Sequence, residues 1–129
     1  MTEIRIVVWQ FVRIMVQLET EASRRRSKGD RRSVLYRNWQ DAWDELDAKL
    51  TELGKRDHRA YSNLMMDQEV VLECASREDL TEVIETVDRV IKRLGDMISR
   101  KQGKTKDLRF EQREMKTLRQ ELEALAAEG

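Results

Sequence analysis

The sequence predicts an all-α protein: an antiparallel bundle of four to five amphipathic helices, with coiled-coil-like self-association as an option. Its 129 residues include no proline and only five glycines, and 39% of them are charged, a composition typical of a helical domain. Apolar residues recur at alternating spacings of three and four along most of the chain, as in packed helices. We therefore expect a single helical-bundle domain over residues 1–129.

The clearest of these apolar seams lies between Ser76 and Arg100. Val83, Val90 and Met97 widen its apolar face, so this helix should contact neighbours on more than one side. Ser76 is a predicted N-cap, and Asp79 stands at the matching position of a capping box. The seam itself consists of Leu80, Ile84, Val87, Ile91, Leu94 and Ile98.

The first helix is expected from Thr2 to about Ser27. Only a narrow polar strip interrupts its apolar surface, so neighbours should cover most of it or it should face a second protein chain. A strand over Ile4–Trp9 is the alternative. The helix is favoured because no partner strand is evident, and a lone strand would leave its backbone groups unpaired.

A turn at Gly29 and Asp30 should separate this helix from a second one, whose seam runs from Leu35 to Leu53. The last helix follows a turn at residues 102–105, and its apolar stripe extends from Leu108.

The region after Leu53 leaves two helix counts open. Gly54 and Asp57 indicate a helix end and a new N-cap, which gives five helices. Apolar spacing that continues to Val71 and Cys74 instead indicates one long helix, which gives four. The break is favoured because the unbroken helix would be about twice as long as the others.

The sequence gives little support for a catalytic or metal-binding site. Cys74 is the only cysteine, which excludes an intrachain disulfide and a cysteine metal cluster, and His58 is the only histidine. The run Gly103–Thr105 imitates the end of a P-loop, but Ile98 stands where the first glycine of that motif belongs. We therefore expect no enzymatic activity, no cofactor and no bound metal.

Basic residues gather around two predicted turns, although lysine plus arginine and aspartate plus glutamate both number 25 over the chain. Such clusters can neutralise phosphates, so both are candidate phosphate-binding sites. They would share one end of a four-helix bundle and lie at opposite ends of a five-helix bundle. The candidates are Arg24, Arg25, Arg26, Lys28, Arg31 and Arg32 at the first turn, and Arg100, Lys101, Lys104 and Lys106 at the last.

Large apolar residues of the first two helices are the candidate protein interface. Aromatic side chains are common interface anchors, although most should belong to the core. Some of these residues lie beside the main seam of the first helix, where a small bundle can leave a patch exposed. The candidates are Trp9, Val12, Val16, Trp39 and Trp43.

These patterns favour a non-enzymatic interaction or assembly protein that forms homo-oligomers or docks onto a partner protein. The alternative is a helical protein that binds the phosphate backbone of nucleic acid through its basic turns. Arg5 and Arg13 interrupt the apolar run of the first helix, so we expect no membrane span and no membrane partner, and a cytoplasmic location.

Overall fold

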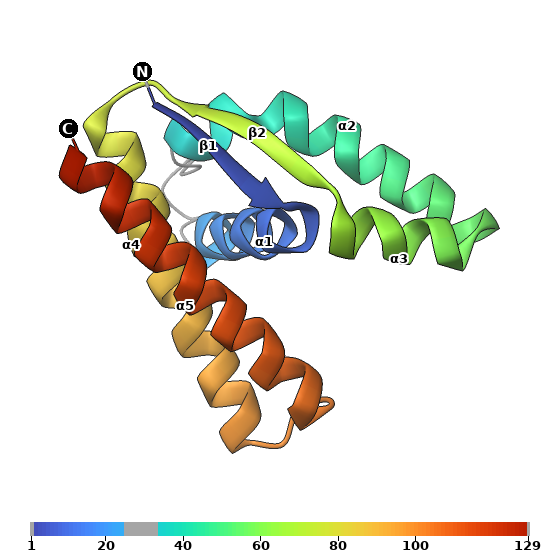
Figure 1. Ribbon diagram of the computed structural model, residues 1–129. Coiled ribbons are helices and arrows are strands. Elements are labelled where there is room, and N and C mark those ends of the chain that lie inside the picture. The colour runs from blue at the N-terminus through green and yellow to red at the C-terminus, as the bar shows by residue number, and fades with distance from the viewer. Residues whose placement is uncertain (1, 25–33, 129) are drawn as a thin grey trace. The chain divides into compact units, whose positions relative to one another are not determined.

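A computed structural model describes residues 2–24 and 34–128, and most of them are helical (Figure 1). The predicted all-α class is confirmed, with a small two-stranded sheet added. The described residues form two compact units, one within residues 3–73 and the other within residues 74–128. The elements in chain order are β1 (Thr2–Val7), α1 (Val8–Arg24), α2 (Val34–Arg56), α3 (His58–Asp67), β2 (Glu69–Cys74), α4 (Arg77–Ser99) and α5 (Thr105–Glu128).

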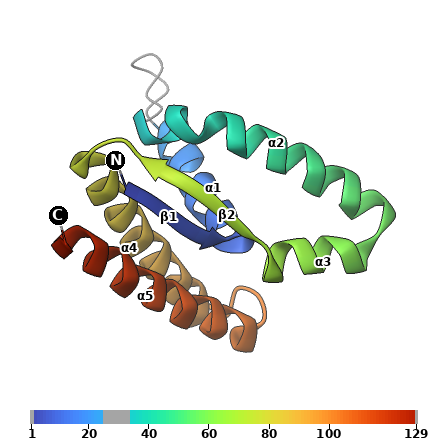
Figure 2. The same ribbon diagram turned by 45° about the horizontal axis from the view of Figure 1, so that its top comes forward.

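Residues 2–7 form a strand, so the helix predicted from Thr2 was wrong over this stretch, and the alternative strand over Ile4–Trp9 was right for residues 4–7 only, since α1 begins at Val8. The physical reason is a period of two: Ile4 and Ile6 are buried, while Glu3 and Arg5 are exposed. β1 and β2 run antiparallel (Figure 2). At their end, the Val8 N–H donates a 2.9 Å hydrogen bond to the Gln68 carbonyl.

The partner strand is β2, where the sequence predicted helix up to Cys74. Leu72 and Cys74 are buried and alternate with exposed Val71 and Glu73. Val71 and Cys74 continue the helical apolar spacing, so the sequence pattern alone does not exclude a helix here. Pairing with β1 selects the strand. The Trp39 indole Nε1–H of α2 donates to the carbonyl of Glu73 at 3.2 Å.

The predicted break after the second helix is confirmed, and it lies at Asp57. α2 passes through Gly54 without interruption and ends at Arg56. Asp57 has an extended backbone, and its carboxylate accepts a 3.1 Å hydrogen bond from the Ala60 N–H, as an N-cap does. The chain therefore re-enters a helix at His58 in a new direction, and five helices result within the described ranges.

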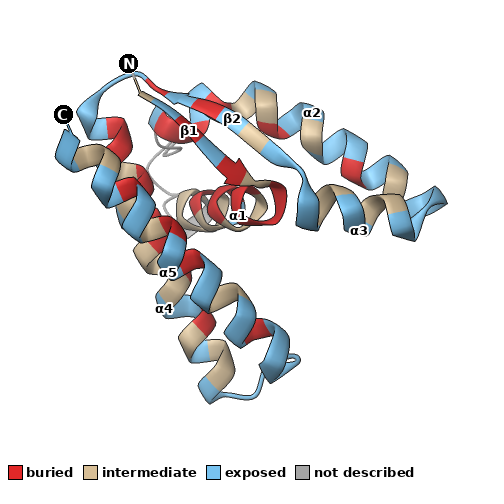
Figure 3. Cartoon of the chain, viewed as in Figure 1, coloured by how far each residue is buried: buried red, intermediate tan, exposed pale blue. Residues whose placement is uncertain are grey.

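An aromatic cluster joins α1 to α2. The ring centroid of Phe11 lies 6.1 Å from that of Trp39 and 6.0 Å from that of Trp43, and the Trp43 contact is edge-to-face. All three residues are buried. Figure 3 shows that buried positions are dense on α1, which explains why its polar strip is so narrow.

In the other unit, α4 begins as predicted. The Ser76 hydroxyl accepts a hydrogen bond from the Asp79 N–H at 3.2 Å. The Asp79 carboxylate reaches back to the Ala75 N–H, also at 3.2 Å, one residue before the position that a standard capping box uses. The two side chains together fix the start of the helix.

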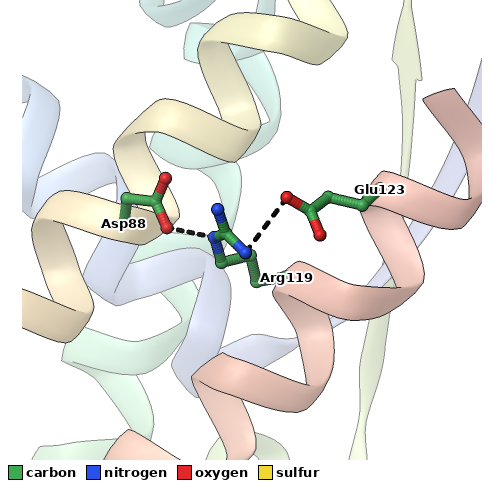
Figure 4. Close-up of polar contacts among 3 residues, drawn as sticks. All are labelled: Asp88, Arg119 and Glu123. Atoms are coloured by element: carbon green, nitrogen blue, oxygen red, sulfur yellow. Dashed lines mark hydrogen bonds and ion pairs between the residues drawn. The ribbon is translucent and has the colours of Figure 1, made fainter.

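α4 and α5 form an antiparallel hairpin, and they lie side by side in both views (Figures 1 and 2). The Gln112 amide of α5 donates to the Ile91 carbonyl of α4 at 3.2 Å. Arg119 of α5 donates to Asp88 of α4 and also pairs with Glu123 at 3.0 Å (Figure 4). The hydrogen bond to Asp88 raises the pKa of Arg119 above its ordinary value. These ion pairs are exposed and contribute little to stability, so apolar packing is the main interaction that stabilises the hairpin.

Candidate protein-docking groove

A groove of about 540 Å³ opens between α1, α2 and α3. All three helices belong to the Glu3–Glu73 unit, and each contributes to its walls. The lining from α1 is Val12 and Val16, and the lining from α3 is His58, Tyr61 and Met65. The lining from α2 is Trp43, Asp47, Leu50, Thr51 and Gly54.

The surface of this groove is mainly apolar. Val16 is 41% exposed, and Val12, Tyr61 and Met65 are half-buried, so their side chains present hydrocarbon to the solvent inside a concave site. Met66, the next residue of α3, is 48% exposed. An accessible apolar set of this kind, carried by three helices, is a feature of docking sites for partner segments.

Trp43 forms one wall of the groove and is held there from behind. Its indole Nε1–H donates a 3.0 Å hydrogen bond to the Glu19 carboxylate of α1. The same carboxylate oxygen accepts a 2.6 Å hydrogen bond from the Tyr36 hydroxyl. With the edge contact to Phe11, these bonds fix the indole, so the groove wall is rigid before anything binds.

α3 folds back against α2 beside Gly54. A Cβ atom built on Gly54 would lie 3.7 Å from the Tyr61 ring, which is ordinary van der Waals contact. The aromatic ring thus covers the bare backbone of α2, and this contact shapes the end of the groove. The polar lining includes Asp47, Thr51 and His58, all of them exposed.

Three of the five interface residues predicted from the sequence meet in this groove: Val12, Val16 and Trp43. Trp9 and Trp39 do not line it, and they are 6% and 3% exposed. Trp43 is also largely buried, at 8% exposed, and differs from them by its place in the groove wall.

The contribution of α3 was missed because the candidate interface residues were taken from the first two helices alone. The signal for α3 is present in the sequence. Asp57 begins a new helix, and Tyr61 and Met65 follow it at a spacing of four, which places them on one face of that helix.

The first basic cluster lies almost entirely outside the described residues. Arg24 is the last residue of α1, and only its backbone is described. The remaining candidates of this cluster are Arg25, Arg26, Lys28, Arg31 and Arg32, all within the stretch 25–33 that the structure does not describe. Whether the two basic turns share an end therefore stays a prediction.

The second cluster surrounds the turn between α4 and α5, and Arg100, Lys101, Lys104 and Lys106 are all exposed. Lys101 has a φ of 55°, a left-handed conformation that favours glycine. Two hydrogen bonds hold this turn: the Gln102 N–H donates to the Met97 carbonyl at 2.9 Å, and the Lys101 N–H donates to the Ile98 carbonyl at 3.2 Å. Together they form a Schellman motif with lysine at the position that glycine usually takes.

The residues that could perform chemistry are dispersed. Across residues 2–24 and 34–128, no group of three histidine, cysteine, aspartate or glutamate side chains is arranged to hold a metal ion. Cys74 is buried, and this burial, together with the charge of Asp79, raises the pKa of its thiol from 9.0 to about 11. A protonated, buried thiol is a poor nucleophile.

No protein-family model, no curated protein and no solved structure matches the sequence. Within the described part of the chain, no helix has both the length and the apolar character that crossing a bilayer requires.

Proposed function

We propose that the protein is a non-enzymatic interaction module, acting in the cytoplasm, that docks a segment of a partner protein into the groove between α1, α2 and α3. The observation that carries this proposal is the groove itself, with an apolar lining and a tryptophan wall. Interface anchors are enriched in aromatic and methionine residues, and Trp43, Tyr61 and Met65 supply both kinds.

An amphipathic helix is the expected form of the docked segment. A helix that lies in a groove inserts apolar residues at spacings of three and four. The exposed hydrocarbon of Val12, Val16 and Met65 gives such residues a surface to cover. Because Glu19 already fixes the Trp43 ring, little side-chain freedom on this wall is lost on binding.

Photo-crosslinking in the native cells tests this proposal. A photoreactive amino acid is placed at Thr51, which is exposed and lines the groove, and in a second protein at Val71, which is 49% exposed on β2 and does not line it. We expect one defined protein to crosslink through Thr51 and not through Val71. Thr51→Trp, which places an indole in the groove, is the control in a competition experiment. Added in excess without a photoreactive group, this variant should fail to displace the crosslinked protein. Equal crosslinking from both positions would refute the groove as the docking site.

A second candidate function is binding of phosphate-rich ligands, such as a nucleic-acid backbone, through the turn between α4 and α5. The observation that favours it is the left-handed Lys101 among exposed cations, because unfavourable backbone conformations are often retained at functional positions. Titration with an oligonucleotide at low and high salt tests it. Binding that weakens steeply with salt and is lost on Lys104→Gln supports the candidate, and absence of binding at low salt rejects it.

A further inference from the structure

We infer that the segment docked in the groove is a basic amphipathic helix, with lysine or arginine beside its apolar stripe. This inference rests on the proposed docking function and adds the charge of the partner. Its starting point is the lining of the groove: among the described residues that line it, Asp47 is the only acidic one, and none is a lysine or arginine. The ionisable lining thus consists of the Asp47 carboxylate and the His58 imidazole, and the carboxylate attracts a positive charge on the docked segment.

The acidic character extends along α2 beyond the groove. Asp44 lies three residues before Asp47, which is about 60° from it around the helix, and it does not line the groove itself; both are exposed. No lysine or arginine occurs on α2 between Arg37 and Lys49. A cation on the docked helix can therefore meet two carboxylates without competition from a neighbouring basic side chain of this stretch.

The same stretch of α2 also supplies an internal control. Asp41 and Glu45 are exposed carboxylates too, but at 100° per residue they lie on the side of α2 away from Trp43, Leu50 and Asp47, which line the groove. Simple attraction to an acidic helix would involve both pairs equally. Docking in the groove involves Asp47, which lines it, and the neighbouring Asp44 more than the opposite pair.

The test uses two synthetic helical peptides of about 18 residues, long enough to form a helix, with the same leucine stripe. One peptide carries lysine beside the stripe, and the other carries glutamate at the same positions. Isothermal titration against the full chain measures each affinity at low salt. We expect the lysine peptide to bind at least about tenfold more tightly, and we expect 0.5 M salt to reduce this ratio by screening, roughly toward one.

Variants of the full chain then locate the charge effect. Asp44→Asn with Asp47→Asn should remove most of the preference for the lysine peptide. Asp41→Asn with Glu45→Gln, which changes the net charge equally, should leave the preference intact. An equal loss in both double variants would overturn the inference, because it would show attraction to α2 as a whole.

The outcomes also separate this inference from the proposed function. If both peptides bind equally and Thr51→Trp blocks both, the groove docks helices but the inference about charge is wrong. If neither peptide binds, the inference is wrong, and the photo-crosslinking experiment decides on the groove independently. Preference for the lysine peptide that Thr51→Trp does not affect would place the binding elsewhere and would also overturn the inference.

Discussion

The Trp43 indole donates a 3.0 Å hydrogen bond to the Glu19 carboxylate, so a charged residue of α1 positions an aromatic wall of α2. Glu19 does not line the groove itself. It also accepts a 2.6 Å hydrogen bond from the Tyr36 hydroxyl, and the two bonds tie α1 to α2 at two points about two turns apart on α2. The shape of the groove therefore depends on a residue that a docked partner need not touch.

Replacement of Glu19 should destabilise the protein and loosen the groove wall. Glu19→Ala leaves the Tyr36 hydroxyl and the Trp43 N–H without their acceptor, which should lower the free energy of unfolding by about 2 kcal/mol. Urea unfolding measures this change. Glu45→Ala, at an exposed position of α2, is the matched control and should change stability by less than about 0.5 kcal/mol. Equal effects of the two replacements would contradict the role given to Glu19.

Gly54→Ala should stabilise the protein, by up to about 1 kcal/mol, because α2 continues through this position and alanine is the better helix former. The added Cβ would meet the Tyr61 ring at an ordinary 3.7 Å. Gly95→Ala in α4 is the comparison, since its Cβ would lie 3.1 Å from the Gln112 amide nitrogen and disturb its bond to Ile91. Thermal unfolding should show a larger gain for Gly54→Ala, and a smaller gain there would refute the geometry.

Lys101→Gly should raise stability by about 1 kcal/mol, because glycine adopts the left-handed conformation of this Schellman turn without a Cβ penalty. Lys116→Gly removes the same charge from the interior of α5 and should lower stability by a similar amount. Chemical unfolding of both variants checks the opposite signs. A loss of stability in Lys101→Gly would show that the lysine side chain has a structural role that outweighs the backbone penalty.

Alkaline pH should destabilise the protein through Cys74. Its folded pKa of about 11 exceeds the ordinary 9.0, so the folded state retains the proton over a range in which the unfolded state loses it. The contribution of Cys74 to stability is thus complete below about pH 9 and is lost as the pH rises toward 11. Unfolding of the wild type and Cys74→Ala at pH 8 and 10.5 isolates this component, and the wild type should lose more stability. Parallel losses in the two proteins would argue against the raised pKa.

Local signals in the sequence were sufficient for several features. Ser76 and Asp57 could be identified as N-caps because a cap needs only a short polar side chain next to the first turn. The helix of residues 76–100 could be predicted because its apolar stripe is regular over about five turns. The strand at Ile4 and Ile6 was missed because its partner, β2, lies more than 60 residues later in the chain.

The candidate site was predictable only in part, for the same reason. Val12, Val16 and Trp43 stood out as apolar residues of the first two helices, but the spacing could not show which of the tryptophans would be enclosed. Trp39 is enclosed beside Phe11, and its Nε1–H is bonded to the Glu73 carbonyl of β2. Contacts of that kind join distant segments, and no local pattern encodes them.

By itself, then, the sequence determined the helical class, the capping residues and the apolar faces, because these depend on residues within a few turns of one another. The tertiary structure alone decided that residues 2–7 and 69–74 pair as strands, because an isolated strand has no stable conformation without a partner. It also decided that α3 turns back against α1 and α2. That turn brings the apolar faces of three helices together around a space that no other described side chain fills. The result is a groove whose lining remains accessible.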